Sequence, residues 1–124
     1  MRTQGDSRMQ HPIEFIVRDA RLDVTETLRE YAARRVAFAL RRFEHRIRRV
    51  TVRLVDLNGP RRGVDSRCSM TVDLVGGRRI FVDATTPWPF ASVTRAASRL
   101  NEAVRRELGR TASRRDTRAQ IRLS

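Results

Sequence analysis

The sequence predicts an α+β domain in which two helices cover one face of a four-stranded mixed sheet, in the order β-α-β-β-β-α. Three observations support this prediction. Four segments alternate apolar and polar residues with the period of strands, two longer segments place apolar residues at helical spacing, and Gly or Pro separates the later strands. A chain of 124 residues is long enough for one such domain with a single core.

The first strand is predicted at PIEFIVRD, residues 12–19, where apolar side chains recur at every second position. A helix follows over residues 23–43, because Thr25 suits an N-cap and neither Gly nor Pro occurs within the segment. At about 100° per residue, one side of this helix is apolar. The residues of that predicted buried stripe are Leu28, Ala32, Val36, Ala39 and Phe43.

Three more alternating segments predict strands at residues 46–57, 67–75 and 78–85. The Gly-Gly pair at 76–77 marks a hairpin between the last two. A two-residue loop would place a polar residue opposite Ile80. A three-residue loop, residues 76–78, pairs Leu74 with Ile80 and Val72 with Val82 instead, and we therefore prefer it.

The last element is predicted as a helix over residues 87–108, with Pro89 in its first turn and Gly109 as its stop. Its apolar face is formed by Phe90, Val93, Ala97, Leu100, Val104 and Leu108. The first crossover should be right-handed and make the first two strands parallel, with antiparallel hairpins after them. We expect residues 1–11 to be a flexible extension, 12–108 the domain, and 109–124 a basic disordered tail.

The charge of the chain predicts a polyanionic partner. All 27 basic residues are arginine, against 14 acidic residues, which gives a net charge of +13 and an isoelectric point near 11.8. Nucleic acid or a ribonucleoprotein is the favoured partner, and an anionic membrane or a merely solvated basic surface are the alternatives. No segment reaches the roughly 18 apolar residues of a membrane span, and the N-terminus lacks the apolar run of a signal peptide. We therefore expect a cytoplasmic protein with no membrane partner.

Candidate catalytic and metal-binding residues are few. Cys68 is the single cysteine and alternates with core residues, while His11 and His45 lie far apart. The sequence has no nucleophile constellation and no Gly-rich phosphate loop. It therefore predicts no enzyme, no metal, no cofactor and no small-molecule substrate.

The candidate nucleic-acid site is formed by arginines on the outer sides of both helices and in the loop DLNGPRRGVD. The helical positions are Arg34, Arg35, Arg41 and Arg42 in the first helix, and Arg95, Arg99, Arg105 and Arg106 in the second. The loop adds Arg61 and Arg62. Guanidinium groups bind phosphate through two parallel hydrogen bonds, so this pattern favours recognition of an RNA backbone by its shape.

Four stretches in order, VTETLREYAARR, ALRRFEHRI, DLNGPRRGVDSRC and ATTPWPFASVTRAASRL, resemble the family of ribosome hibernation-promoting factors and ribosome-associated inhibitors, formerly called sigma-54 modulation proteins. The likeness covers about residues 12–108. It implies binding to the 16S rRNA of the small subunit and to whole ribosomes, where the protein blocks the mRNA and the A- and P-site tRNA channel during stress or stationary phase.

The resemblance also implies which individual arginines contact rRNA. Basic positions of the family match Arg35, Arg42, Arg99, Arg105 and Arg106, whereas the other arginines rest on their helical or loop positions alone. Relatives commonly carry acids where this chain has Trp88 and Thr94. Long members add a C-terminal domain that pairs ribosomes, and residues 109–124 cannot supply it, so we expect ribosome silencing without ribosome dimerisation by this chain alone. We also expect the free protein to be a monomer. A general binder of double-stranded RNA or DNA, or a protein module regulating a transcription factor, are the alternative functions.

Overall fold

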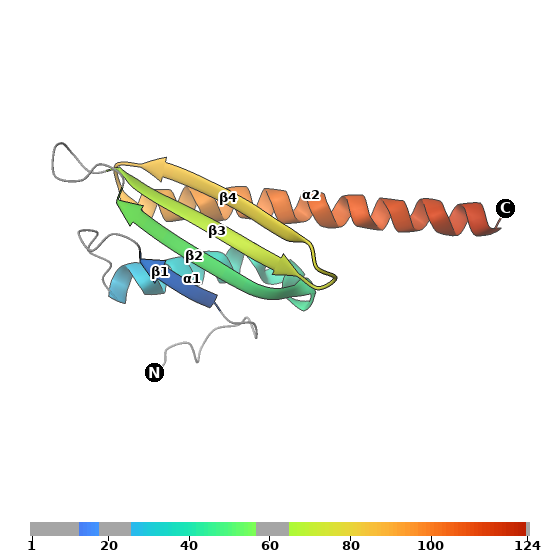
Figure 1. Cartoon of the computed structure of the whole chain (residues 1–124), viewed down its shortest axis with the longest axis horizontal. Coiled ribbons are helices and arrows are strands. Elements are labelled where there is room, and N and C mark those ends of the chain that lie inside the picture. The colour runs from blue at the N-terminus through green and yellow to red at the C-terminus, as the bar shows by residue number, and fades with distance from the viewer. Residues whose placement is uncertain (1–12, 18–25, 57–64, 124) are drawn as a thin grey trace.

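The computed structural model describes residues 13–17, 26–56 and 65–123, and it has the predicted order of elements (Figure 1). The elements are β1 (Ile13–Val17), α1 (Glu26–Leu40), the 3₁₀ helix η2 (Arg41–Arg46), β2 (Ile47–Asp56), β3 (Ser66–Leu74), β4 (Arg79–Thr86) and α2 (Pro89–Leu123). The α+β class with two helices is therefore confirmed. The extension at residues 1–11, the predicted N-cap at Thr25, and Arg61 and Arg62 lie outside the described residues.

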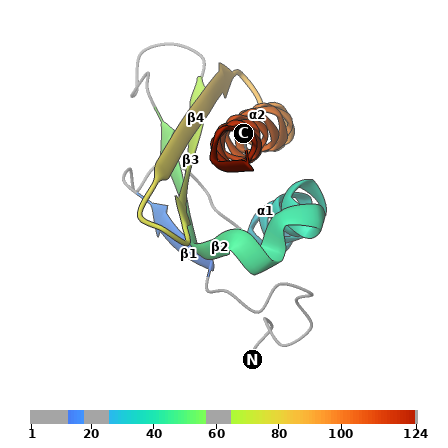
Figure 2. The same cartoon turned by 90° about the vertical axis from the view of Figure 1, so that its right-hand side faces the viewer.

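The sheet has the strand order β1-β2-β3-β4, with β1 parallel to β2 and antiparallel pairing from β2 to β4. Figure 2 shows α1 and α2 side by side on one face of this sheet. A parallel pair needs a crossover between its strands, and α1 lies within that crossover. Neither of these described helices covers the other face, so the sheet has one packed side and one open side.

The register of the β3–β4 hairpin differs from the predicted one. The predicted pairing of Leu74 with Ile80 is wrong: Val72 lies opposite Ile80, and Met70 lies opposite Val82. This register is shifted by two residues from the prediction. Because side chains alternate with a period of two, such a shift leaves every residue on its predicted face.

Residues 75–78 join the two strands, and the backbone hydrogen bond that closes the loop encloses three residues, 75–77, rather than the predicted 76–78. Leu74 N donates to Arg78 O at 2.8 Å and closes the loop, and Val75 N donates to Arg46 O at 2.8 Å. Both glycines of the loop have positive φ, +102° and +96°. Only glycine adopts such backbone conformations without steric cost, so the Gly-Gly pair determines where the chain reverses.

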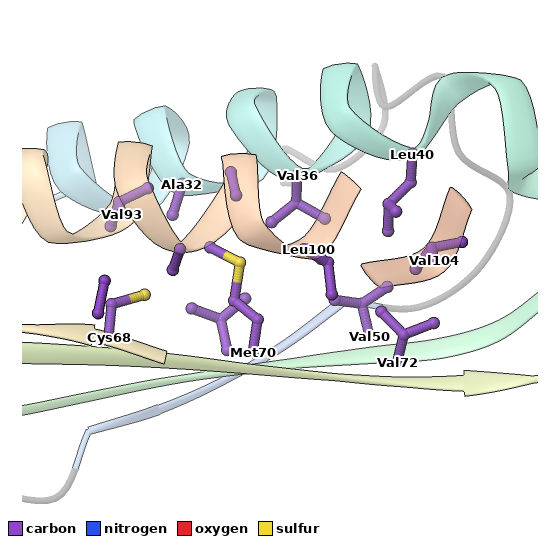
Figure 3. Packing of buried hydrophobic residues seen from close by; sticks show 14 of the residues in the cluster. Ala32, Val36, Leu40, Val50, Cys68, Met70, Val72, Val93, Leu100 and Val104 are labelled. Atoms are coloured by element: carbon purple, nitrogen blue, oxygen red, sulfur yellow. The ribbon is translucent and has the colours of Figure 1, made fainter. Parts of the chain in front are cut away.

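The core lies between the sheet and the two helices (Figure 3). Strand side chains alternate between this core and the open face, as the period of two predicts. The strand residues in the core are Ile47, Val50, Val52, Leu54, Cys68, Met70, Val72, Leu74 and Ala84, and the helical ones are Leu28, Ala32, Val36, Leu40, Val93, Ala96, Ala97, Leu100 and Val104. Burying a large aliphatic side chain contributes about 1.5–3 kcal/mol, so this layer is the main source of stability.

The end of the first helix departs from the prediction. Leu40 is fully buried, whereas Ala39 and Phe43, which were predicted in the stripe, are half-buried. The α-helix stops at Leu40, and the chain continues as the 3₁₀ helix η2. A 3₁₀ helix has about 3.0 residues per turn instead of 3.6, so Phe43 is rotated away from the position that the α-helical period gives it.

The second helix also differs, since it does not stop at Gly109 but continues to Leu123. The predicted disordered tail is therefore helical over residues 109–123. Figure 1 shows this part of α2 extending beyond the end of the sheet. Gly109 lacks the positive φ of a C-cap glycine. Across it, Arg110 Nη2 lies 2.6 Å from Glu107 Oε1, and Arg78 Nη2 of the hairpin lies 2.9 Å from the other oxygen of this buried carboxylate.

Replacing Gly109 by alanine should stabilise the protein. Nothing lies within 4 Å of a Cβ built at this position, and the helical backbone suits alanine. Alanine has a higher helix propensity than glycine, so we expect a gain of about 0.5–1 kcal/mol in the free energy of unfolding and a small increase in helical circular dichroism. Urea denaturation measures the first quantity. A loss of stability would instead make Gly109 a helix stop.

Candidate nucleic-acid interface

The two helices run parallel and form one surface. Tyr31 Oη lies 2.5 Å from Thr94 Oγ1, and further along both helices Asn101 Nδ2 donates to Ala39 O at 2.8 Å. The Tyr31 and Phe90 rings meet edge to face, with centroids 5.2 Å apart. Because the contacting positions increase together in both helices, α1 and α2 point the same way. Their outer sides therefore lie next to each other, as the sequence predicts.

Four predicted site residues come from α1 and η2. Arg34, Arg41 and Arg42 are exposed, and the Arg41 guanidinium lies 5.5 Å from the centroid of the Phe38 ring. Arg35 is half-buried, and its Nε has no hydrogen-bond partner among the described residues. It lies one turn from Tyr31, which contacts α2, so it is on the side of α1 next to that helix.

The predicted residues of α2 are more strongly engaged by the protein itself. Arg105 Nη2 donates to both oxygens of Glu102, at 2.9 and 3.1 Å, and Arg106 Nη2 lies 3.7 Å from the same carboxylate. Arg99 Nη1 donates to the backbone oxygen of Asp83 in β4 at 2.6 Å. Arg95 is exposed, and no ion pair involves it in the part of the chain that the structure describes.

The structure thus divides the ten predicted site residues into three groups. Those without an ion pair to any described residue are Arg34, Arg35, Arg41, Arg42 and Arg95, which we call the free arginines. Those held by the protein are Arg99, Arg105 and Arg106. Arg61 and Arg62 fall in residues 57–64, which the structure does not describe. Four of the five free arginines lie in α1 and η2, and one lies in α2.

The open face of the sheet carries arginines that were not predicted as site residues. Arg67 lies 2.8 Å from Asp83 and Arg79 lies 2.6 Å from Asp73, each from guanidinium nitrogen to carboxylate oxygen. Each of these two arginines is thus paired with a carboxylate on the same face. The alternation of the strands could have placed these residues together, because all four alternate along β3 and β4 with residues of the core.

Other candidate chemistry is limited. Burial of Cys68 raises the pKa of its thiol from 9.0 to about 12, so the thiol is neutral and unreactive at physiological pH. His45 is exposed. Among residues 13–17, 26–56 and 65–123, no three His, Cys, Asp or Glu side chains come together as metal ligands. Within those same ranges, no helix has the length and apolar character that crossing a bilayer requires.

Comparison with known proteins identifies the family. The model for the sigma 54 modulation protein / S30EA ribosomal protein family matches residues 15–112. The chain belongs to this family. The resemblance found in the four sequence stretches is thereby confirmed, and the family match extends past Gly109 into the continued part of α2. No curated protein matches the chain.

Two solved structures share the fold of this family member. The N-terminal domain of Protein Y from Thermus thermophilus has a TM-score of 0.58 at 23% identity, and the similarity covers 79% of this chain and 96% of that one. A ribosomal subunit interface protein from Coxiella burnetii has a TM-score of 0.60 at 14% identity, covering 78% and 98%. At these identities the similarity concerns the fold.

Proposed function

We propose that this protein is a ribosome hibernation factor that binds the 16S rRNA of the small subunit and occupies the channel for mRNA and the A- and P-site tRNAs. The free arginines on the parallel helices are the observation that carries this proposal. They make no ion pair with any described residue and are carried by packed helical elements, and the chain belongs to a family described as ribosomal. Two solved proteins with the same fold include one named for the ribosomal subunit interface.

Inhibition by this protein would require no chemistry. A folded domain that occupies the channel excludes mRNA and tRNA by volume alone, so affinity and position are sufficient. Phosphate contacts supply that affinity by releasing counterions from the RNA, which makes binding strongly dependent on salt. The small subunit offers a defined RNA shape, and arginines fixed on two packed helices can match it without reading bases. Such an inhibitor suits stationary phase or stress, when translation must stop reversibly.

Sedimentation with purified ribosomal particles tests the proposal. The protein should cosediment with small subunits and whole ribosomes at low salt and be released as salt is raised. Small subunits loaded with mRNA and P-site tRNA should bind it much more weakly, because the ligands compete for the same space. Absence from the particle fractions at low salt would refute ribosome binding. Equal affinity for a free RNA duplex and for the small subunit would favour a general binder of double-stranded nucleic acid instead.

A further inference from the structure

Trp88 has an exposed side chain on a firmly held backbone. It is the single tryptophan of the chain, and 70% of it is accessible to solvent. Pro87 and Pro89 flank it, and each restricts its own φ. Trp88 N donates to Thr86 Oγ1 at 3.1 Å, and Trp88 O accepts hydrogen bonds from Thr86 Oγ1 at 2.7 Å and from Ser92 N at 3.0 Å. The backbone at this position is thus fixed on both sides of the residue.

A buried polar network fixes this turn to the sheet. Ser92 Oγ accepts from Thr86 N at 3.1 Å and donates to Ser66 O at 2.7 Å, and Thr86 Oγ1 lies 2.8 Å from Ser92 Oγ. Ser92 is completely buried, and Thr86 nearly so. Buried polar groups with partners are ordered, because losing those partners is costly. The network therefore joins the turn that carries Trp88 to β3, β4 and the start of α2.

The sequence around Trp88 contains an arginine and an aromatic residue but no acid. No acidic residue occurs from Ala84 to Asn101, a stretch that contains the free arginine Arg95. Phe90 is also partly exposed, at 41%, and contacts Tyr31. An indole that is 70% exposed buries little apolar surface, so core packing alone does not account for its position. A ligand that suits both the charge and the flat apolar surface is an anion with aromatic faces, and a nucleotide of RNA has both properties.

We propose that Trp88 stacks on an unpaired nucleobase of the rRNA where the helices dock on the small subunit. This inference rests on the proposed ribosome binding and adds a contact of different chemistry to it. The arginines would neutralise phosphates, while the indole would bind the face of a base. Because the backbone of Trp88 is already ordered before binding, stacking loses less conformational entropy than it would in a mobile loop.

Intrinsic fluorescence provides a test, since Trp88 is the only tryptophan of this chain. Ribosomal proteins also contain tryptophan, so a parallel titration with the Trp88→Phe protein is subtracted to isolate the emission of Trp88. Titration of the full-length protein with small subunits should quench its emission, because stacked bases quench indole fluorescence, and should shield the indole from acrylamide. Trp88→Ala should weaken binding by about five- to one-hundred-fold, whereas Trp88→Phe should retain most of the affinity. The matched control is Phe81→Ala, which removes an aromatic side chain that is 56% exposed on the open face of the sheet. It should leave affinity unchanged.

The possible outcomes separate this inference from the proposed function. The unchanged protein could cosediment with small subunits while its tryptophan emission stays the same and Trp88→Ala binds with the same affinity. That result would overturn the stacking contact but would leave ribosome binding supported. A blue shift without quenching would indicate burial against a ribosomal protein and would also overturn it. A blue shift obtained with phosphatidylglycerol vesicles but not with small subunits would indicate binding to a membrane, and it would also overturn the stacking contact. Failure of every variant, and of the unchanged protein, to cosediment would refute the proposed function itself.

Discussion

Replacement of Arg34, Arg42 and Arg95 by glutamate should reduce affinity for the small subunit by more than a hundredfold at low salt. Each of these residues is exposed, and no ion pair holds it within the described parts of the chain. Hydrogen bonds to charged groups contribute about 1.5–3 kcal/mol each, and a glutamate at the same position adds repulsion from phosphate. The dependence of log affinity on log salt should become shallower by about 0.9 for every phosphate that the variant no longer neutralises. Cosedimentation across a salt series measures both effects.

Thermal stability should be unaffected by these substitutions, since none of the three side chains belongs to the core. A matched pair of single variants separates position from total charge. Arg42 and Arg48 are both exposed and without an ion pair to a described residue, but Arg48 lies in β2 and not on the helices. Arg42→Glu should weaken binding, and Arg48→Glu should do so much less. Equal reductions in affinity would mean that binding depends on the overall charge and that the helix surface is not the site.

Replacement of Leu100 by alanine should destabilise the fold by about 2–5 kcal/mol. Leu100 is fully buried in α2, where it packs between the helices and the sheet (Figure 3). Removing its terminal carbons leaves a cavity that a close-packed core cannot fill completely. For a domain of this size each kcal/mol lowers Tm by roughly 4–8 °C, so we expect a decrease of about 10 °C or more, measured by calorimetry.

Two further variants control this experiment. Ser98→Ala changes an exposed position of the same helix and should alter stability by no more than about 0.5 kcal/mol. Leu100→Met keeps most of the volume and should cost less than about 1.5 kcal/mol. At temperatures where Leu100→Ala remains folded, its affinity for the small subunit should match that of the unchanged protein. An unchanged Tm would mean that the packing shown around Leu100 does not stabilise the domain.

The periodicity of apolar residues predicted the type of each element and the face on which its side chains lie. Alternation placed the side chains of β3 and β4 on their correct faces, because the face of a strand residue depends only on the period of two. Register was not predictable from alternation, since a shift of two residues preserves every face. The change to 3₁₀ geometry after Leu40 and the continuation of α2 through Gly109 were also missed. Contacts with other elements lie close to both places. Asn101 donates to Ala39 O in the last turn of α1, and Glu107 forms an ion pair with Arg78 of the hairpin.

Part of the candidate site was also predictable from periodicity. Helical period places exposed arginines such as Arg34 and Arg95 on the outer sides of α1 and α2, and this required no knowledge of packing. The pairing of Arg105 and Arg106 with Glu102 could have been predicted too, because their spacings of three and four are those of helical ion pairs. The contact of Arg99 with β4 could not, since the two elements meet only in the folded chain. The fixed, exposed position of Trp88 likewise depends on a network that joins three elements.

The hydrogen bond from Arg99 to Asp83 O has a consequence for self-association. β4 is an edge strand of the sheet, and an edge strand offers unpaired backbone groups to any strand of another molecule. Arg99 of α2 occupies one of these acceptors with a charged donor. A second strand could pair with β4 at Asp83 only by displacing this guanidinium. A residue that sequence predicts as an RNA contact therefore also protects the edge of the sheet against aggregation.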